Sequence, residues 1–239
     1  MKVLGFDTAT PATTVALWDS HGGQVASRDD PPPGGRPGHA TRLMPLIVEV
    51  LERSGAGWDE IDRIAIGVGP GTFTGLRIGI ATAKALSRAR GIPLSGVSTL
   101  QSLAMNARAG EWPEPIELVL AVLDARRGEA FVAGWHPRAL ADPGPAVVAP
   151  RAIAPEPLAT LVAGGPSALA LGDGAVEFRQ ILEHSGALVP DDESEFHRIT
   201  AINHCVLAGR LPASGPEDIR PEYLRLPDAE ISRRKAGSQ

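Results

Sequence analysis

The sequence predicts an α/β fold made of two halves that repeat one order of strands and helices. Short apolar strands alternate with longer helices along most of the chain. In each half the first strand leads into a second strand, and both opening strands end in an aspartate, Asp7 and Asp124. The order β-β-β-α-β-α in each half therefore predicts an internal duplication.

In the first half, three strands form a meander before the first helix. A loop rich in proline and glycine, residues 29–38, cannot sustain regular structure and separates the meander from that helix. A strand, a glycine turn, a second helix and a final strand follow. The expected strands cover residues 3–6, 13–18, 23–28, 61–68 and 94–97, and the expected helices cover residues 39–54 and 74–90.

The second half restarts a similar order after a loop at residues 111–115, with DARRGE as the turn between its first two strands. The expected strands cover residues 117–123, 130–135, 146–149 and 168–171, and the expected helices cover residues 156–163, 175–184 and 198–209. These limits predict an N-terminal subdomain over 1–110, a C-terminal subdomain over 111–212 and a partly disordered tail over 213–239.

The composition is that of an ordinary globular protein. Of 239 residues, 43% are hydrophobic and 21% are charged, and the formal charge of -5 gives no footprint of an autonomous nucleic-acid binder. The single cysteine, Cys205, excludes an intramolecular disulfide and favours a reducing compartment. The N-terminus lacks the apolar region of a signal peptide, and no segment approaches the roughly 20 apolar residues of a membrane span. We expect a cytoplasmic protein without membrane contact.

The segment GVGPGTFTGLRIGIATAKAL, residues 67–86, looks like a phosphate-binding loop but lacks the residues that such a loop requires. Counting a P-loop from Gly69 puts Thr74 at the second glycine, and counting from Gly71 puts Leu76 there. The dinucleotide pattern G-x-G-x-x-G also fails at Thr74. A sharp strand-to-helix turn accounts for the glycines, although an amide-lined helix terminus favours an anion. We expect weak nucleotide binding or none, and no cofactor.

The strand order separates two kinds of α/β fold. A dinucleotide-binding fold feeds its first strand into a helix, whereas this duplicated order resembles the actin-like superfamily, in which two halves flank a cleft. There the first-hairpin aspartate helps to hold magnesium. Here a turn-stabilising Asp7 is the alternative, because Pro11 removes an amide donor from the loop. The candidates for a vestigial phosphate loop are Asp7, Thr8, Thr10, Gly69, Gly71 and Thr72.

Two helices carry more apolar residues than one buried side requires. In the helix over 39–54, large apolar side chains extend beyond a single stripe. In the helix over 74–90, one face is apolar and much of the opposite side consists of small uncharged residues. One side can pack on the chain's own sheet, while the other can contact a second subunit or another layer of the same domain. The candidate interface residues are His39, Leu43, Met44, Ile47, Leu51, Phe73, Leu76, Arg77 and Ile80.

Other chemical patterns are weak. No HExxH motif occurs, and a zinc site from His197, His204 and Glu195 is an alternative to ordinary structural histidines. A nucleophile elbow is also missing, because residues 96–100 lack the second glycine. Cys205 lies in an apolar helix and is expected in the core. The arginine pair at positions 126 and 127 marks either a solvated turn or a contact with tRNA or a partner.

Taken together, the motifs resemble the TsaB (YeaZ) family. FDTAT, the glycine-turn segment, GVSTLQSLA, DARRGEAF, LGDGA and RPEYLR follow one another in the family's order over nearly the whole chain. The resemblance implies an actin-like fold and a place in the bacterial machinery that makes N6-threonylcarbamoyladenosine at position 37 of tRNAs. TsaB proteins pair there with TsaD, and an ATPase, TsaE, docks on the pair.

The resemblance also implies that this chain is not the catalytic member. TsaD proteins hold a metal on a His-x-x-x-His motif, and Thr99 and Leu103 stand at the two histidine positions here. We therefore expect no catalytic residue and no metal, and contact with tRNA only through the complex. Two other functions stay open: an independent ATPase or small-molecule kinase, motivated by the fold alone, and a peptidase.

The two apolar helices would pack against the equivalent helices of TsaD. In the absence of a partner, the same face would join two copies of this chain into a homodimer. A charged residue in place of Leu43 or Ile47 is then expected to give a monomer.

Overall fold

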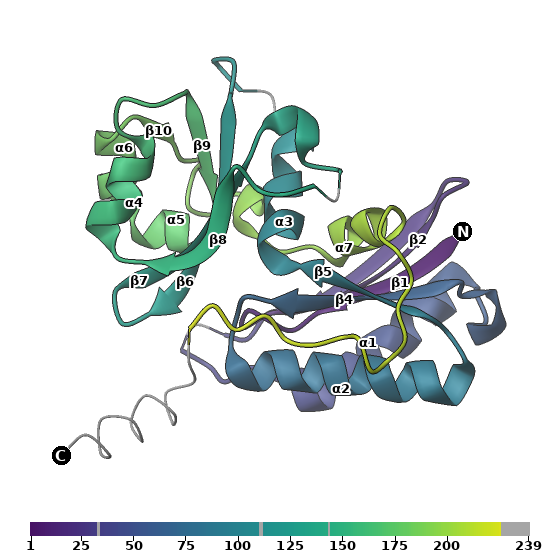
Figure 1. Ribbon diagram of the computed structural model, residues 1–239. Helices are drawn as coiled ribbons and strands as arrows, with labels where there is room; N and C mark the ends of the chain where they lie inside the picture. The colour runs from purple at the N-terminus through teal and green to yellow at the C-terminus, as the bar shows by residue number, and fades with distance from the viewer. Residues whose placement is uncertain (33, 110–111, 143, 226–239) are drawn as a thin grey trace.

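The computed structural model describes residues 1–32, 34–109, 112–142 and 144–225, and it contains two five-stranded sheets (Figure 1). The strands are β1 (Lys2–Asp7), β2 (Thr13–Asp19), β3 (Gln24–Asp29), β4 (Arg63–Gly69), β5 (Leu94–Ser98), β6 (Leu118–Arg126), β7 (Glu129–Trp135), β8 (Val148–Ile153), β9 (Ala168–Leu171) and β10 (Ala187–Leu188). The helices are α1 (His39–Ser54), α2 (Phe73–Arg90), α3 (Thr99–Ala104), α4 (Pro155–Val162), α5 (Asp173–Glu177), α6 (Arg179–His184) and α7 (Ala201–Ala208). Short 3-10 turns cover Trp58–Glu60, Met105–Ala109, Pro137–Ala139 and Glu195–His197.

Both sheets are built on the same plan, as the duplication predicts. The first has the order β3-β2-β1-β4-β5 and the second the order β10-β9-β6-β7-β8. β1 pairs antiparallel with β2 and parallel with β4, and β6 pairs antiparallel with β7 and parallel with β9. The central strands are apolar on both faces because helices cover both sides of each sheet.

The elements stack in five layers (Figure 1). The outermost layer consists of α1 and α2, which cover one face of the first sheet, and a core rich in leucine and isoleucine fills the space between them. α3 and α7 lie between the two sheets, in a second core that includes side chains from both. α4, α5 and α6 cover the remaining face of the second sheet over a third core. Consequently α1 and α2 turn their other sides away from the molecule.

Several elements differ from the sequence-based limits. The helix expected over 175–184 is two helices that meet at Phe178, and the strand expected over 146–149 lies at Val148–Ile153. α3 was not expected, and it is capped by the Ser98 hydroxyl, which accepts the Gln101 N–H at 3.4 Å. α7 begins after the capping residue Thr200 and packs on β1 and β2 of the first sheet.

The chain after α7 runs along the edge of the first sheet. Ser214 pairs with Leu94 of β5, and the Glu222 N–H donates to the Val68 carbonyl at 2.7 Å. Of the tail that was expected over 213–239 to be partly disordered, residues 213–225 are ordered along this edge, and residues 226–239 lie outside the described residues. Within the described part of the chain, no helix combines the length and the apolar character needed to cross a membrane.

Candidate functional site

The glycine turn brings α2 into direct contact with the loop after β1. The backbone N–H of Thr72 donates to the Ala9 carbonyl at 2.7 Å, and the Thr8 hydroxyl donates to the Gly75 carbonyl at 2.7 Å. A Cβ atom on Gly71 or Gly75 would meet the backbone of this loop closer than 3.0 Å. These glycines therefore permit close packing between backbone segments.

The residues proposed for a vestigial phosphate loop do not surround one site. Asp7 and Thr8 are buried under the loop, and Gly69 precedes a cis peptide bond to Pro70 at the end of β4. Only Thr10, Gly71 and Thr72 border an open pocket. The sequence placed these residue types correctly at two neighbouring turns, but it could not show that the turns press against each other.

Asp7 lies at the centre of a buried polar network. Its Oδ1 accepts the Ala9 N–H at 2.6 Å, its Oδ2 accepts the Thr99 hydroxyl at 2.8 Å, and His204 Nε2 lies 3.0 Å from Oδ2. Burial by itself would raise the pKa of Asp7, but His204, the Ala9 amide and the Thr99 hydroxyl stabilise the carboxylate and hold the pKa below its ordinary value. The carboxylate thus closes a turn and ties β1 to α3 and α7.

The same network contains a Ser-His-Asp arrangement. Ser102 Oγ lies 2.7 Å from His204 Nδ1, and His204 Nε2 faces Asp7. A hydrolase needs such a serine to meet its substrate, yet Ser102, His204 and Asp7 are all buried between the layers. The arrangement is therefore a packing feature and gives no support to the peptidase alternative.

The proposed zinc ligands are engaged elsewhere. His197 Nδ1 accepts the Gly172 N–H at 3.0 Å, and its Nε2 lies 3.0 Å from the Pro190 carbonyl. His204 belongs to the Asp7 network. Over the described residues, no three His, Cys, Asp or Glu side chains are grouped as a metal site would require. Cys205 is fully buried, and burial raises the pKa of its thiol.

The structure corrects most of the proposed interface residues. Leu43, Ile47, Leu51 and Ile80 are buried in the chain's own core under the first sheet. Leu76 is also buried, and His39 is buried against the Thr13 hydroxyl. Such side chains have no surface left for a partner, because the sheet already covers them. A charge at Leu43 or Ile47 would therefore disrupt the fold, and it is not a test of dimerisation. Of the proposed set, Met44, Phe73 and Arg77 remain exposed.

α1 and α2 nevertheless present an exposed surface of modest size, which we call the outer helix face. On α1, Met44 and Val48 are one turn apart and are 41% and 45% exposed. The two helices pack side by side, so their outward residues form one surface. The outer helix face consists of Met44 and Val48 of α1 and of Thr74, Arg77, Ala81 and Ala85 of α2, all exposed.

An aromatic cluster stands at the N-terminal end of α2. The rings of Phe73 and Tyr223 lie 5.3 Å apart, and the Arg77 guanidinium sits 3.7 Å from the centre of the Phe73 ring. Two residues further on, Arg225 pairs with Glu129 of β7 at 2.9 Å. Residues 213–225 thus connect the first sheet, the start of α2 and the second sheet. Sequence reasoning missed this connection, because nothing local predicts where a tail packs.

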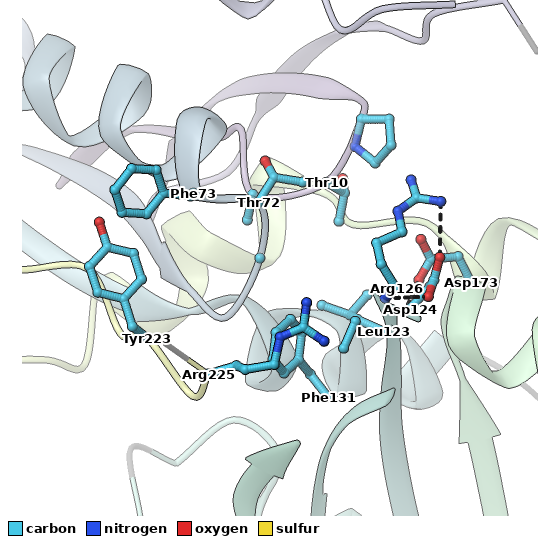
Figure 2. Close-up of a pocket in the computed structure, with 14 residues that line it drawn as sticks. Thr10, Thr72, Phe73, Leu123, Asp124, Arg126, Phe131, Asp173, Tyr223 and Arg225 are labelled. Atoms are coloured by element: carbon cyan, nitrogen blue, oxygen red, sulfur yellow. Dashed lines mark hydrogen bonds and ion pairs between the residues drawn. The ribbon is translucent and has the colours of Figure 1, made fainter. Parts of the chain in front are cut away.

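A pocket of about 240 Å³ lies where the two opening hairpins face each other. Figure 2 shows Thr10, Thr72 and Phe73 on one side of it and Arg126 and Asp173 on the other. Asp124 Oδ2 pairs with Arg126 at 3.1 Å. Asp173 is exposed at the rim of the pocket, but the protein around its carboxyl group desolvates it in part and raises its pKa, and the Asp124 carboxylate acts in the same direction. The lining therefore mixes acids and bases that pair with each other.

Duplicated sheets, a pocket between the two opening hairpins and helices outside and between the sheets define an actin-like α/β protein. The fold is similar to that of the ethanolamine utilization protein EutJ from Carboxydothermus hydrogenoformans, with a TM-score of 0.50, 12% identity and coverage of 87% of this chain and 89% of that one. It is closer to YeaZ from Pseudomonas aeruginosa, with a TM-score of 0.75, 27% identity and coverage of 93% and 99%.

Sequence comparison gives the family. The family model "TsaD: tRNA N6-adenosine threonylcarbamoyltransferase" matches residues 32–139. The Escherichia coli K12 "tRNA threonylcarbamoyladenosine biosynthesis protein TsaB" is 40% identical over 57% of this chain and 55% of its own length. Mb3455c of Mycobacterium bovis is 33% identical over 95% of this chain and 93% of its own length. This chain belongs to the TsaB (YeaZ) family, and the match spans about half the length of the Escherichia coli relative.

Proposed function

We propose that this chain acts in the biosynthesis of N6-threonylcarbamoyladenosine in tRNA as a non-catalytic subunit that binds a TsaD protein. The Escherichia coli relative, by its name a protein of tRNA threonylcarbamoyladenosine biosynthesis, supports the pathway. The TsaD family model matches the part of this chain that contains α1 and α2, which supports descent from a common ancestor. In a two-fold symmetric dimer both subunits use the same surface patch, so a partner of the same fold would meet this chain through its equivalent helices.

The observation that carries the proposal is the outer helix face. α1 and α2 form the outermost layer of the molecule, and their exposed side chains include Met44, Val48 and Phe73. Full burial of a large apolar side chain contributes about 1.5–3 kcal/mol, and each of these is already partly covered, so each adds a fraction of that. Ala81 and Ala85 allow a partner helix to approach α2 closely, because their side chains are short.

The lack of a catalytic role rests on the residues at the positions of the TsaD histidines. Thr99 donates its hydroxyl to Asp7, and Leu103 is buried in the core between the sheets. A leucine side chain cannot ligate a metal, and the Thr99 hydroxyl is already engaged. The reaction would therefore take place on TsaD, with this chain as a required subunit.

The same proposal covers the remaining partners. TsaE binds the pair of TsaB and TsaD, and tRNA contacts this chain only within that complex. In the absence of TsaD, two copies of this chain pair through the outer helix face. The chain needs no cofactor of its own, its nucleotide binding is weak, and it works in the cytoplasm.

Reconstitution tests the proposal. The purified chain and TsaD are expected to co-elute in size-exclusion chromatography as one species larger than either alone. With TsaE, threonylcarbamoyl-adenylate and unmodified tRNA, nucleoside analysis by mass spectrometry is expected to find the modified adenosine only when this chain is added. Separate elution together with unchanged modification in its absence would contradict the proposal.

A further inference from the structure

α2 has a charge that is opposite to that of the molecule. Its sequence, FTGLRIGIATAKALSRAR, contains Arg77, Lys84, Arg88 and Arg90 and no acidic residue, whereas the chain as a whole has a formal charge of -5. A helix that contains cations and no carboxylate cannot form ion pairs between its own side chains three or four residues apart, which stabilise many surface helices. Its acidic counterparts must come from another segment or another molecule.

The cations lie along one flank of the helix. Lys84 is two turns after Arg77 and Arg88 is one turn further, so helical spacing puts all three on the same side. Arg77 and Arg88 are exposed and Lys84 is partly exposed. This flank borders the alanines of the outer helix face. A partner that covers Ala81 and Ala85 must therefore come close to these cations.

Within the described part of the chain, one acid lies against this flank. It is Glu217, which comes from the segment that runs along the edge of the first sheet; its carboxylate pairs with Arg88 and also attracts Lys84 at longer range. Among the described residues, no acid lies within ion-pair distance of Arg77, Lys84 or Arg90; Arg77 covers Phe73, and Arg90 lies 5.2 Å from the ring of Trp58. The pairing of Arg88 shows that a carboxylate from a neighbouring segment fits against this flank.

α1 does not balance the remaining charge. Its arginines are paired, Arg42 with Asp29 at 2.8 Å and Arg53 with Glu49 at 3.1 Å, on the side that faces β3. Glu52 is its one exposed acid without such a pair within the described chain. The surface offered by the two helices therefore keeps an excess of positive charge.

We propose that the α2 flank selects an acidic helix, so that the partner places carboxylates opposite Arg77 and Lys84 while two copies of this chain repel each other there. The inference rests on the proposed function, because it describes the TsaD surface that meets the outer helix face. It adds a reason why this chain would bind TsaD in preference to a second copy of itself. In an assembly of two copies the apolar contacts are available, but cations face cations.

Salt separates the two assemblies. Screening shortens the reach of charges from about 10 Å at 0.1 M salt to about 3 Å at 1 M. Added salt therefore weakens the complex with TsaD, where the charges attract. It strengthens the pairing of two copies, where the charges repel. Opposite responses to salt cannot arise from apolar contacts alone.

The test is sedimentation velocity of the full chain, alone and with TsaD, from about 0.05 to 0.5 M NaCl, a range over which surface charges become largely screened. The variants are Lys84→Glu and, as a matched charge reversal on β8 of the second sheet, Arg151→Glu, where residue 151 is exposed. Circular dichroism verifies that each variant is folded. We expect Lys84→Glu to weaken the TsaD complex about three- to tenfold at low salt and to strengthen self-association, while Arg151→Glu changes neither.

Affinities for TsaD that are independent of salt, or equal for the two variants, would overturn the inference and leave the proposed function standing. Self-association that is tightest at low salt would also overturn it. Failure of the folded wild-type chain to bind TsaD at every salt concentration would overturn the proposed function itself.

Discussion

Replacement of Gly75 by alanine tests whether the glycines of the turn serve close packing. Gly75 lies in the first turn of α2, and its carbonyl accepts the Thr8 hydroxyl at 2.7 Å. A Cβ atom at this position would lie 1.9 Å from the Thr8 carbonyl oxygen, where ordinary contact begins at 3.4 Å. The obstacle is backbone, so no side-chain rotation can relieve the clash.

The cost follows from the atoms that must move. Overpacking that shifts backbone costs about 1–3 kcal/mol, and loss of the Thr8 hydrogen bond adds about 0.5–1.5 kcal/mol. Alanine returns about 1 kcal/mol through its higher helix propensity. The Gly75→Ala variant is therefore expected to lose about 0.5–3.5 kcal/mol of unfolding free energy.

Urea denaturation followed by circular dichroism measures this loss. Gly57→Ala is the matched control, because a Cβ atom there would meet nothing within 4 Å and the backbone has a φ of -81°. That variant is expected to be as stable as the wild type or slightly more stable. A Gly75→Ala variant with wild-type stability would refute the packing explanation for the glycine turn.

Two further predictions concern buried groups. Ile47→Glu should leave the chain unfolded, since Ile47 is 0% exposed and a core site cannot accept a carboxylate. Val48→Glu, at the neighbouring position, should change the unfolding free energy by less than about 0.5 kcal/mol. Equal urea midpoints for the two variants would contradict this prediction. The pKa of Asp7 is lower in the folded chain than its ordinary value of 3.8, so its charged form stabilises the fold above that pH, and this stabilisation is lost as the pH falls below it. The Asp7→Asn variant should thus be less stable than the wild type at neutral pH, and its stability should decline less than that of the wild type on acidification. Parallel stability profiles of the two proteins from pH 6 to 2 would disprove this role of the Asp7 carboxylate.

The sequence predicted the limits of a helix well where a single helical pattern of apolar residues extends over the whole helix. α1 begins and ends at the predicted residues, and α2 begins one residue earlier than predicted. The strand pattern was also enough to predict the duplicated actin-like order, because the first strand leads into a second strand and not into a helix, as it would in a dinucleotide-binding fold. α3 was not predicted, because a six-residue helix directly after a strand is too short to show the helical period of apolar residues.

The site was harder to predict, because its contacts join distant segments. The apolar residues of α1 suggested two covered sides, but periodicity could not tell that Leu43 and Ile47 face the sheet while Met44 and Val48 face outward. Asp7 meets His204 across 197 positions of sequence. No local pattern encodes such a contact, whereas the motif order that indicated the family is local and could be read directly.

The most direct test of the account is the affinity of TsaD for two variants with one substitution each, measured by sedimentation velocity at fixed salt. Val48→Glu alters the outer helix face, and Val147→Glu makes the same change in the second half, where the valine is 54% exposed. We predict that Val48→Glu weakens the complex by about tenfold or more, while Val147→Glu binds as the wild type does. Wild-type affinity of a folded Val48→Glu variant would contradict the claim that this chain works through that face.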